Sequence, residues 1–153
     1  NLNEILRDVL EICTPRLLGA GIVVDWQPAA TLPPMIGRPR QLRMLFKALV
    51  DNAIEAMNIK GWKRRELRLS SPVKRDCIVI SVCDSGPGIP PEWRHKAFEP
   101  FFTAKNSSGR HIGTGLSRAQ QVVADHGGII DLEESASGGC AAIVEFRLDG
   151  DPI

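Results

Sequence analysis

The feature that most constrains the fold is the stretch CIVISVCD, from Cys77 to Asp84, which is apolar on both of its faces. Side chains alternate between the two faces of a sheet, so Ile78 and Ile80 share one face while Val79 lies on the other. A strand that is apolar on both faces is typical of the middle of a covered sheet. It ends at a carboxylate, and the glycines and prolines of the following SGPGIP end the strand. The sequence therefore predicts a central strand with an acid at its end.

Three helices and four further strands are predicted around this strand. Apolar residues recur at helical spacing in 2–13, 38–57 and 115–126, and strands are expected at 22–27, 66–70, 129–134 and 141–148. Pro15 should lie close to the end of the first helix. The inward stripe of the second helix is Leu42, Leu45, Phe46, Leu49, Ala53 and Met57. We expect one α/β domain over residues 1–153, a two-layer sandwich in which three main helices cover one face of a mixed, mostly antiparallel sheet of about five strands.

Composition excludes several classes of protein. The chain has 153 residues, 43% of them hydrophobic and 24% charged, and its net charge of +1 gives no drive towards nucleic acid. No apolar run approaches the roughly 18 residues that a membrane-spanning helix needs. The four cysteines form no CxxC pair, so we expect reduced thiols and a cytoplasmic protein. Because the chain lacks an initiator Met, we interpret it as a fragment of a larger protein.

The basic stretch KGWKRRELR, which begins at Lys60, has two interpretations. Most charge runs of this kind are solvated loops. The alternative is a docking patch in which Trp62 is the aromatic anchor.

Two polar residues are candidates for ligand binding. Asn52 lies on the flank of the second helix, one turn after Ala48, and its amide oxygen could hold a hard cation such as Mg²⁺ or simply mark the polar edge of the helix. Asp84 could accept a hydrogen bond from an exocyclic amine such as that of adenine, while Gly86 and Gly88 would let a flat ring approach the backbone. The alternative for Asp84 is a tight turn in which the carboxylate caps its own backbone.

A third candidate is the run IGTGLS at 112–117, where two glycines directly precede a helix. Free backbone N–H groups and the helix dipole favour phosphate at such a place, although an ordinary glycine-rich helix entry has the same pattern. The run is not a P-loop, because GxxxxGK[ST] does not occur.

In this order and spacing, the motifs resemble the ATP-binding domains of the histidine-kinase, gyrase, Hsp90 and MutL superfamily (the GHKL or Bergerat fold), and within it the histidine-kinase branch. ALVDNAIEAM is similar to the N box, DSGPGIP to the G1 box and FEPFFTAK to the F box. HIGTGLSRAQQVVADHGG is similar to the G2 box and the helix that follows it. The resemblance covers the chain from about Leu2 to Leu148.

The resemblance implies that the domain binds ADP or ATP with Mg²⁺. It assigns Asp84 to the adenine amino group, Gly86 and Gly88 to the floor of the pocket, and Asn52 to the metal. The segment 89–113 would be a mobile lid over the nucleotide. The other implied nucleotide contacts lie in this lid and just beyond it: Ile89, Phe98, Lys105, Gly113, Thr114, Gly115 and Leu116.

Two residues depart from the family pattern. Ala48 stands where the ATPase branches have a general-base Glu and histidine kinases commonly have Asn, and His111 stands where the G2 box usually has glycine. The first interpretation is therefore a nucleotide-responsive switch in a histidine-kinase-like regulator, of the kind known from NifL-type regulators of nitrogen fixation, that acts on a partner such as a transcriptional activator. Little ATP hydrolysis is then expected, and we assign no catalytic residue.

The alternative is the catalytic domain of an active sensor histidine kinase that signals to a response regulator. None of His95, His111 and His126 lies in the sequence context of a phosphoacceptor. Under either interpretation, the phosphoacceptor and dimerisation domain is expected elsewhere in the full-length chain.

Overall fold

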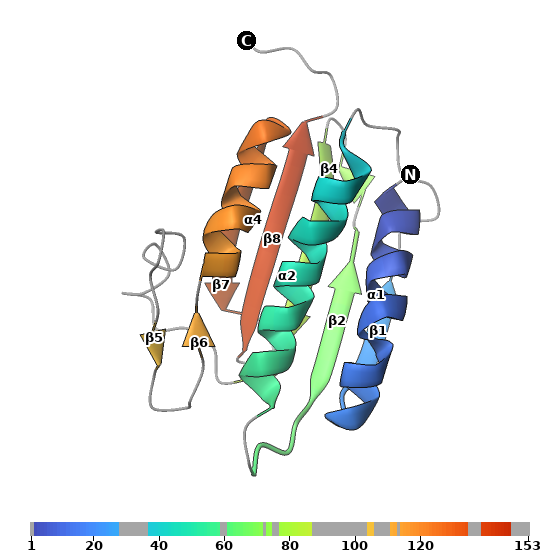
Figure 1. Cartoon of the computed structure of the whole chain (residues 1–153), viewed down its shortest axis with the longest axis vertical. Helices are drawn as coiled ribbons and strands as arrows, with labels where there is room; N and C mark the ends of the chain where they lie inside the picture. Colours follow the sequence, from blue (N-terminus) through green and yellow to red (C-terminus); the bar gives the residue numbers. More distant parts are fainter. Residues whose placement is uncertain are drawn as a thin grey trace.

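The computed structural model describes residues 2–27, 37–58, 61–71, 73–74, 77–86, 104–105, 111–112, 114–134 and 139–147. Three helices, α1 (Leu2–Gly19), α2 (Pro39–Met57) and α4 (Thr114–Asp125), lie side by side on one face of a sheet, with α2 in the middle (Figure 1). This is the predicted two-layer α/β sandwich.

The sheet has the strand order β1-β2-β4-β8-β7, with β3 paired to β4. Its strands are β1 (Val23–Gln27), β2 (Glu66–Ser70), β3 (Val73–Lys74), β4 (Cys77–Asp84), β7 (Gly128–Glu134) and β8 (Cys140–Arg147). Only the β1–β2 pair among these is parallel, so the sheet is mixed and mostly antiparallel as predicted. The short β3 makes it six-stranded rather than five-stranded. The strand β4 lies between β2 and β8, which confirms its central place.

The core fills the layer between the helices and the sheet. All six residues of the predicted α2 stripe are buried, and Phe46 and Met57 are fully enclosed. Val50, Ile54 and Ala56 are buried as well, because α2 packs against α1 on one side and α4 on the other. A helix between two others buries a wider face than a single stripe predicts.

The first helix is longer than expected. It continues past Pro15 to Gly19, although a proline inside a helix removes one backbone hydrogen bond. Leu17, in the extra turn, is buried against the core, and this apolar contact offsets the cost of the proline.

The end of α4 is tied to the start of α2 by His126. Its Nε2 accepts a hydrogen bond from the backbone N–H of Arg38 at 3.0 Å, so the proton is on Nδ1, which donates to the carbonyl of Val122 at 2.8 Å. Both ring nitrogens therefore hold the fold together.

A separate two-stranded sheet pairs β5 (Ala104–Lys105) with β6 (His111–Ile112), with Lys105 opposite His111. Both strands fall inside the segment predicted to be a lid, and β6 lies against α2.

Candidate nucleotide site

Asp84 ends the central strand and is 3% exposed. Its Oδ1 accepts hydrogen bonds from the backbone N–H groups of Gly86, at 2.9 Å, and Cys140, at 3.2 Å. Such donors offset the cost of removing a carboxylate from water. The self-capping turn considered from the sequence is thus present, but the second donor comes from β8, 56 residues away in the chain. A local turn alone does not account for this placement.

Two glycines let the backbone approach this carboxylate closely. A Cβ on Gly139 would lie 2.1 Å from the carbonyl oxygen of Asp84, and one on Gly86 would lie 3.0 Å from the carbonyl oxygen of Ala56. The sequence predicts that Gly86 lets a flat ring approach the backbone, whereas the atom nearest to its missing side chain in the structure is the carbonyl oxygen of Ala56 in α2. Gly139 was missed, because the sequence pattern assigned it only to a hairpin turn; its place directly before the strand that pairs with β4 was the available signal. We call Asp84, Ser85, Gly86, Gly139 and Cys140 the strand-end site.

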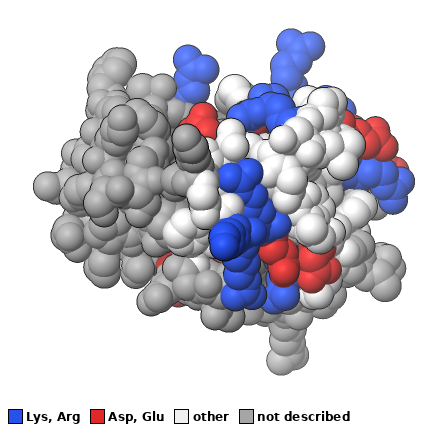
Figure 2. Space-filling view, turned by 90° about the horizontal axis from the view of Figure 1, so that it is seen from below, with Lys and Arg blue, Asp and Glu red and all other residues white. Residues whose placement is uncertain are grey.

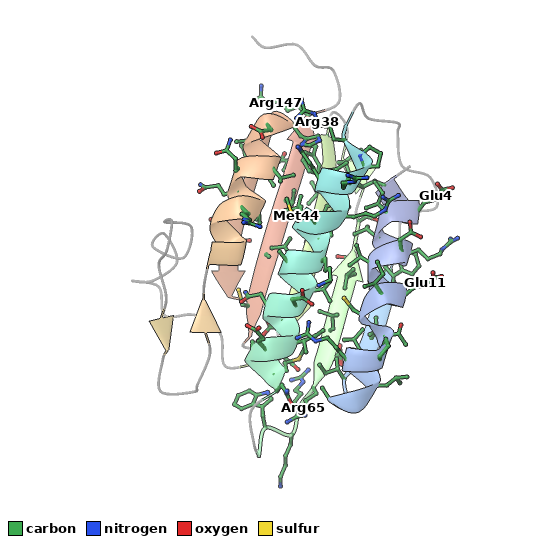
Figure 3. All side chains as sticks on the ribbon, viewed as in Figure 1. Glu4, Glu11, Arg38, Met44, Arg65 and Arg147 are labelled. Atoms are coloured by element: carbon green, nitrogen blue, oxygen red, sulfur yellow. The ribbon has the colours of Figure 1, made fainter. Side chains whose placement is uncertain are left out.

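The basic stretch contributes structure to the strand-end site. Trp62 packs against the core, and its indole Nε1–H donates to the carbonyl of Ser85 at 3.0 Å. Trp62 is partly buried and takes part in the fold through these contacts, while its role as the anchor of a docking patch stays a prediction. Arg65 lies at the lower end of the molecule in Figure 3, and Figure 2, seen from that end, shows basic side chains gathered on it.

Asn52 is half-buried on α2, on the flank of the helix where the sequence predicted it. Its neighbour Asp51 is engaged elsewhere: it forms ion pairs with Arg16 of α1 and, at 2.8 Å, with Lys47. Asp51 is therefore held towards α1. Asn52 remains the candidate metal ligand on this helix.

A groove of about 180 Å³ runs between α2 and α4. Met44 lies on the side of α2 that faces α4 (Figure 3). Ala48 contributes only a methyl group to the lining, so this position offers neither a base nor a metal ligand. The lining residues, which we call the helix groove, are Met44, Leu45, Lys47, Ala48, Asp51, Arg118, Ala119 and Val122.

Thr114, Gly115 and Leu116 form the first turn of α4, which confirms that the glycine run opens a helix. Lys105 lies in β5. Gly88, Ile89, Phe98 and Gly113 lie outside the described residues.

Chemically, the described residues fit an adenine nucleotide with its metal. The strand-end site supplies a buried acceptor beside a backbone that bears no side chain, and the start of α4 supplies the N–H groups that bind phosphate. Among the described residues, no group of three or more His, Cys, Asp and Glu could hold a metal ion alone. Asn52 offers an amide oxygen of the kind that can complete the coordination of a phosphate-bound Mg²⁺.

Two further observations limit the chemistry. Burial, together with the charge of Asp84, raises the pKa of the Cys83 thiol, so Cys83 is not an activated nucleophile. All four cysteines are free thiols, as predicted. Within the helices that the structure describes, none combines the length and hydropathy needed to cross a bilayer.

Comparison with known proteins identifies relatives of the whole fold. Residues 37–150 match the family described as histidine kinase-, DNA gyrase B-, and HSP90-like ATPase. The chain is 33% identical to the sensor protein CitS of Halalkalibacterium halodurans over 126 residues, which cover 81% of this chain and 23% of CitS. It is 31% identical to the sensor histidine kinase TmoS of Ectopseudomonas mendocina over 150 residues, which cover 97% of this chain and 15% of TmoS. The chain thus spans less than a quarter of the length of these relatives.

A solved structure confirms the predicted fold. The catalytic domain of histidine kinase ThkA, in a nucleotide-free form, superposes with a TM-score of 0.81 at 30% identity, covering 96% of this chain and 94% of that domain. ThkA has also been solved in complex with the response regulator protein TrrA; that structure superposes with a TM-score of 0.78 at 28% identity, covering 96% of this chain and 40% of the other.

Proposed function

Because this chain belongs to the family of histidine kinase-, DNA gyrase B- and HSP90-like ATPases, we propose that it is the ATP-binding part of a two-component sensor kinase. In this proposal it binds ATP with Mg²⁺ and presents the terminal phosphate to a histidine outside this chain. The observation that carries the proposal is the buried Asp84 carboxylate at the strand-end site, 3% exposed, with Gly86 and Gly139 packed against it. The names of the relatives, sensor proteins and sensor histidine kinases, support it.

Each residue has a defined task in the proposal. Asp84 accepts a hydrogen bond from the adenine amino group, and it would face the carbonyl of guanine unfavourably. The N–H groups of the first turn of α4 bind the phosphates, together with Lys105 and Gly113. Bound Mg²⁺ supplies charge neutralisation on the phosphates, and Asn52 holds it in place. In this proposal, Gly88 belongs to the floor of the pocket with Gly86, and the segment 89–113, which includes Ile89 and Phe98, serves as the lid over the nucleotide.

A second function is favoured by one observation, the methyl group of Ala48 in the helix groove. A general base that orients water typically supplies about 10²–10⁴ in rate, and alanine supplies none of it. Nucleotide binding does not need a general base, because in this proposal Asp84, Asn52 and the start of α4 bind the nucleotide and its metal at positions other than Ala48. The chain would then be a nucleotide-responsive switch, in which ADP and ATP differ in their affinity for two conformations that a protein partner distinguishes.

Titration calorimetry of the chain with ADP, ATP and GDP in Mg²⁺ tests the shared part of both functions. We expect binding of ADP and ATP and much weaker binding of GDP. Equal affinity for ADP and GDP would contradict the assignment of Asp84 to adenine.

Labelled ATP then separates the two functions in the full-length protein. Transfer of the label to a histidine, and from there to a response regulator, supports the kinase. Tight ATP binding without transfer, combined with partner binding that differs between ADP and ATP, supports the switch. In the Ala48→Glu variant, a gain in single-turnover hydrolysis would show that this position limits the attack of water.

A further inference from the structure

Ser85 is a buried polar residue in the middle of the strand-end site, and nothing above gives it a task. It is 3% exposed and stands between Asp84 and Gly86. Its hydroxyl accepts a hydrogen bond from the backbone N–H of Glu66 at 2.8 Å and donates to the carbonyl of Arg64 at 2.7 Å. Its own carbonyl accepts the indole N–H of Trp62 at 3.0 Å. Ser85 is thus joined by three hydrogen bonds to residues 62–66, which lead into β2 and include its first residue.

These hydrogen bonds lie just beyond the end of the pairing between β2 and β4. The last residue pair between β2 and β4 is Leu67 opposite Asp84, so the chain beyond Asp84 has no further strand pairing with β2. Ser85 replaces that pairing with side-chain hydrogen bonds. The backbone of the turn is therefore held beyond the end of the β2–β4 ladder.

The segment that holds Ser85 is itself anchored. The Nε–H of Arg65 donates to the carbonyl of Trp62 at 2.9 Å, and its Nη1 donates to the carbonyl of Ala20 at 2.6 Å. The carbonyl of Arg65 accepts the N–H of Val23 at 3.0 Å. Residues 62–65 therefore form a bracket between β4 on one side and the end of α1 and start of β1 on the other.

On its opposite side, the same turn meets β8. The N–H of Cys140 donates to Asp84 Oδ1, and Gly139 lies in close contact with the Asp84 backbone. The carboxylate thus lies between two supports, one from β8 and one from the bracket. Loss of either support would let the acid move relative to the sheet.

We propose that Ser85 and Trp62 are positioning residues that fix the Asp84 carboxylate for recognition of an adenine base. The inference rests on the proposed function, because it assumes that adenine is bound by Asp84. Neither residue touches the nucleotide in this proposal. They act by holding the turn that follows the acid, opposite the support from β8, so that its acceptor oxygens keep one direction.

The test compares Ser85→Ala and Trp62→Phe with Trp26→Phe as the matched control. Trp26 is also packed against the core, but among the described residues its indole nitrogen has no hydrogen-bond partner. Calorimetry far below the unfolding temperature measures ADP affinity for each variant. We expect a loss of about five- to thirtyfold for Ser85→Ala and Trp62→Phe, as for one or two lost buried hydrogen bonds, and no change for Trp26→Phe.

Non-additivity separates positioning from general stability. Each substitution is repeated in the Asp84→Asn background, where a residue that acts through Asp84 should lose most of its effect. Losses that persist in full in that background would overturn the inference, as would unchanged ADP affinity in both single variants. A fall in unfolding temperature alone, with ADP affinity retained, would also overturn it.

Failure of the proposed function is distinguishable from failure of the inference. If the unmodified chain bound no ADP, the assignment of adenine to Asp84, and with it this inference, would be overturned. Amide hydrogen exchange at Gly86 needs no nucleotide and tests the bracket alone. Faster exchange in Ser85→Ala supports the bracket, and unchanged exchange contradicts it.

Discussion

The strand-end site, beside the carboxyl end of α2, and the helix groove, between α2 and α4, are built on different principles. At the strand-end site the acid is 3% exposed and its partners are backbone N–H groups. At the helix groove the acid is Asp51, whose side chain is 26% exposed and pairs with the longer, more exposed side chains of Arg16 and Lys47. One site is fixed by the fold itself, and the other is held by surface charges.

Under the proposed function, the strand-end site recognises the base, while the helix groove contains Ala48 at the position where related ATPases have a general base. One backbone donor to Asp84, the N–H of Cys140, belongs to β8 and cannot reorient without disturbing that strand, so we expect the strand-end site to be ordered before any ligand arrives. Surface ion pairs are weak and exchange with water, so the groove side can adapt. Substitutions at the two sites should accordingly differ in size and in their dependence on salt.

The largest expected effect is that of Asp84→Asn on nucleotide binding. The substitution keeps the shape of the side chain but removes its charge and half of its acceptor capacity. We expect a loss of about 2–4 kcal/mol in the free energy of ADP binding, as for a charged buried hydrogen bond, together with a smaller preference for ADP over GDP. Titration calorimetry measures both, and an unchanged preference would contradict the assignment.

Gly139→Ala should destabilise the fold itself. Its Cβ would stand 2.1 Å from the carbonyl oxygen of Asp84, so the backbone of β4 or β8 must move. Overpacking of this kind typically costs about 1–3 kcal/mol of folding free energy. The matched control is Gly19→Ala, where nothing lies within 4 Å of the new Cβ. Urea unfolding measures the free energy of unfolding of both variants. Equal values for Gly139→Ala and Gly19→Ala would contradict the close packing of Gly139 against Asp84.

Asn52→Ala tests the candidate metal ligand on α2. We expect ADP affinity to fall about tenfold in Mg²⁺, which corresponds to about 1.4 kcal/mol, and to change little when a chelator removes the metal. Full affinity at saturating Mg²⁺ would mean that Asn52 only marks the polar edge of the helix. Since Asn52 is half-buried, its removal should leave the unfolding temperature nearly unchanged.

The smallest effect is expected for Asp51→Asn. Its ion pairs with Arg16 and Lys47 are partly exposed, so their loss should cost less than about 1 kcal/mol of folding free energy. The difference from the unmodified chain should shrink further in high salt, because salt screens such pairs. A loss as large as that of Gly139→Ala, or one independent of salt, would contradict the contrast between the two sites.

The sequence predicted the sheet and the helices well, because the evidence for them is local. The two apolar faces of 77–84 predicted a central strand, and the apolar stripe on α2 predicted which face of that helix is buried. It also placed Asn52 and Asp84 on the correct elements. It failed for Pro15, where tertiary burial of Leu17 outweighs the local cost of proline within the helix.

The supports of Asp84 could not be predicted in the same way. Trp62 donates to the carbonyl of Ser85, 23 positions away, and Gly139 contacts the backbone of Asp84, 55 positions away. No local sequence pattern predicts such contacts. Trp62 stands in a basic stretch that suggests an exposed loop. The parallel pairing of β1 with β2 brings the end of α1 beside residues 62–65. This tertiary contact, which no local pattern predicts, positions the indole of Trp62.

The position of β8 in the sheet has a consequence for the biogenesis of the protein. It follows every other strand that the structure describes, yet it lies inside the sheet between β4 and β7 and supplies the Cys140 donor to Asp84. As the chain emerges from the ribosome, β4 is available long before the strand that completes its acid. Nucleotide binding therefore cannot begin until β8 has inserted, since an earlier intermediate has an unfinished sheet with open edges. Nucleotide binding by the nascent chain would thus indicate that β8 has joined the sheet.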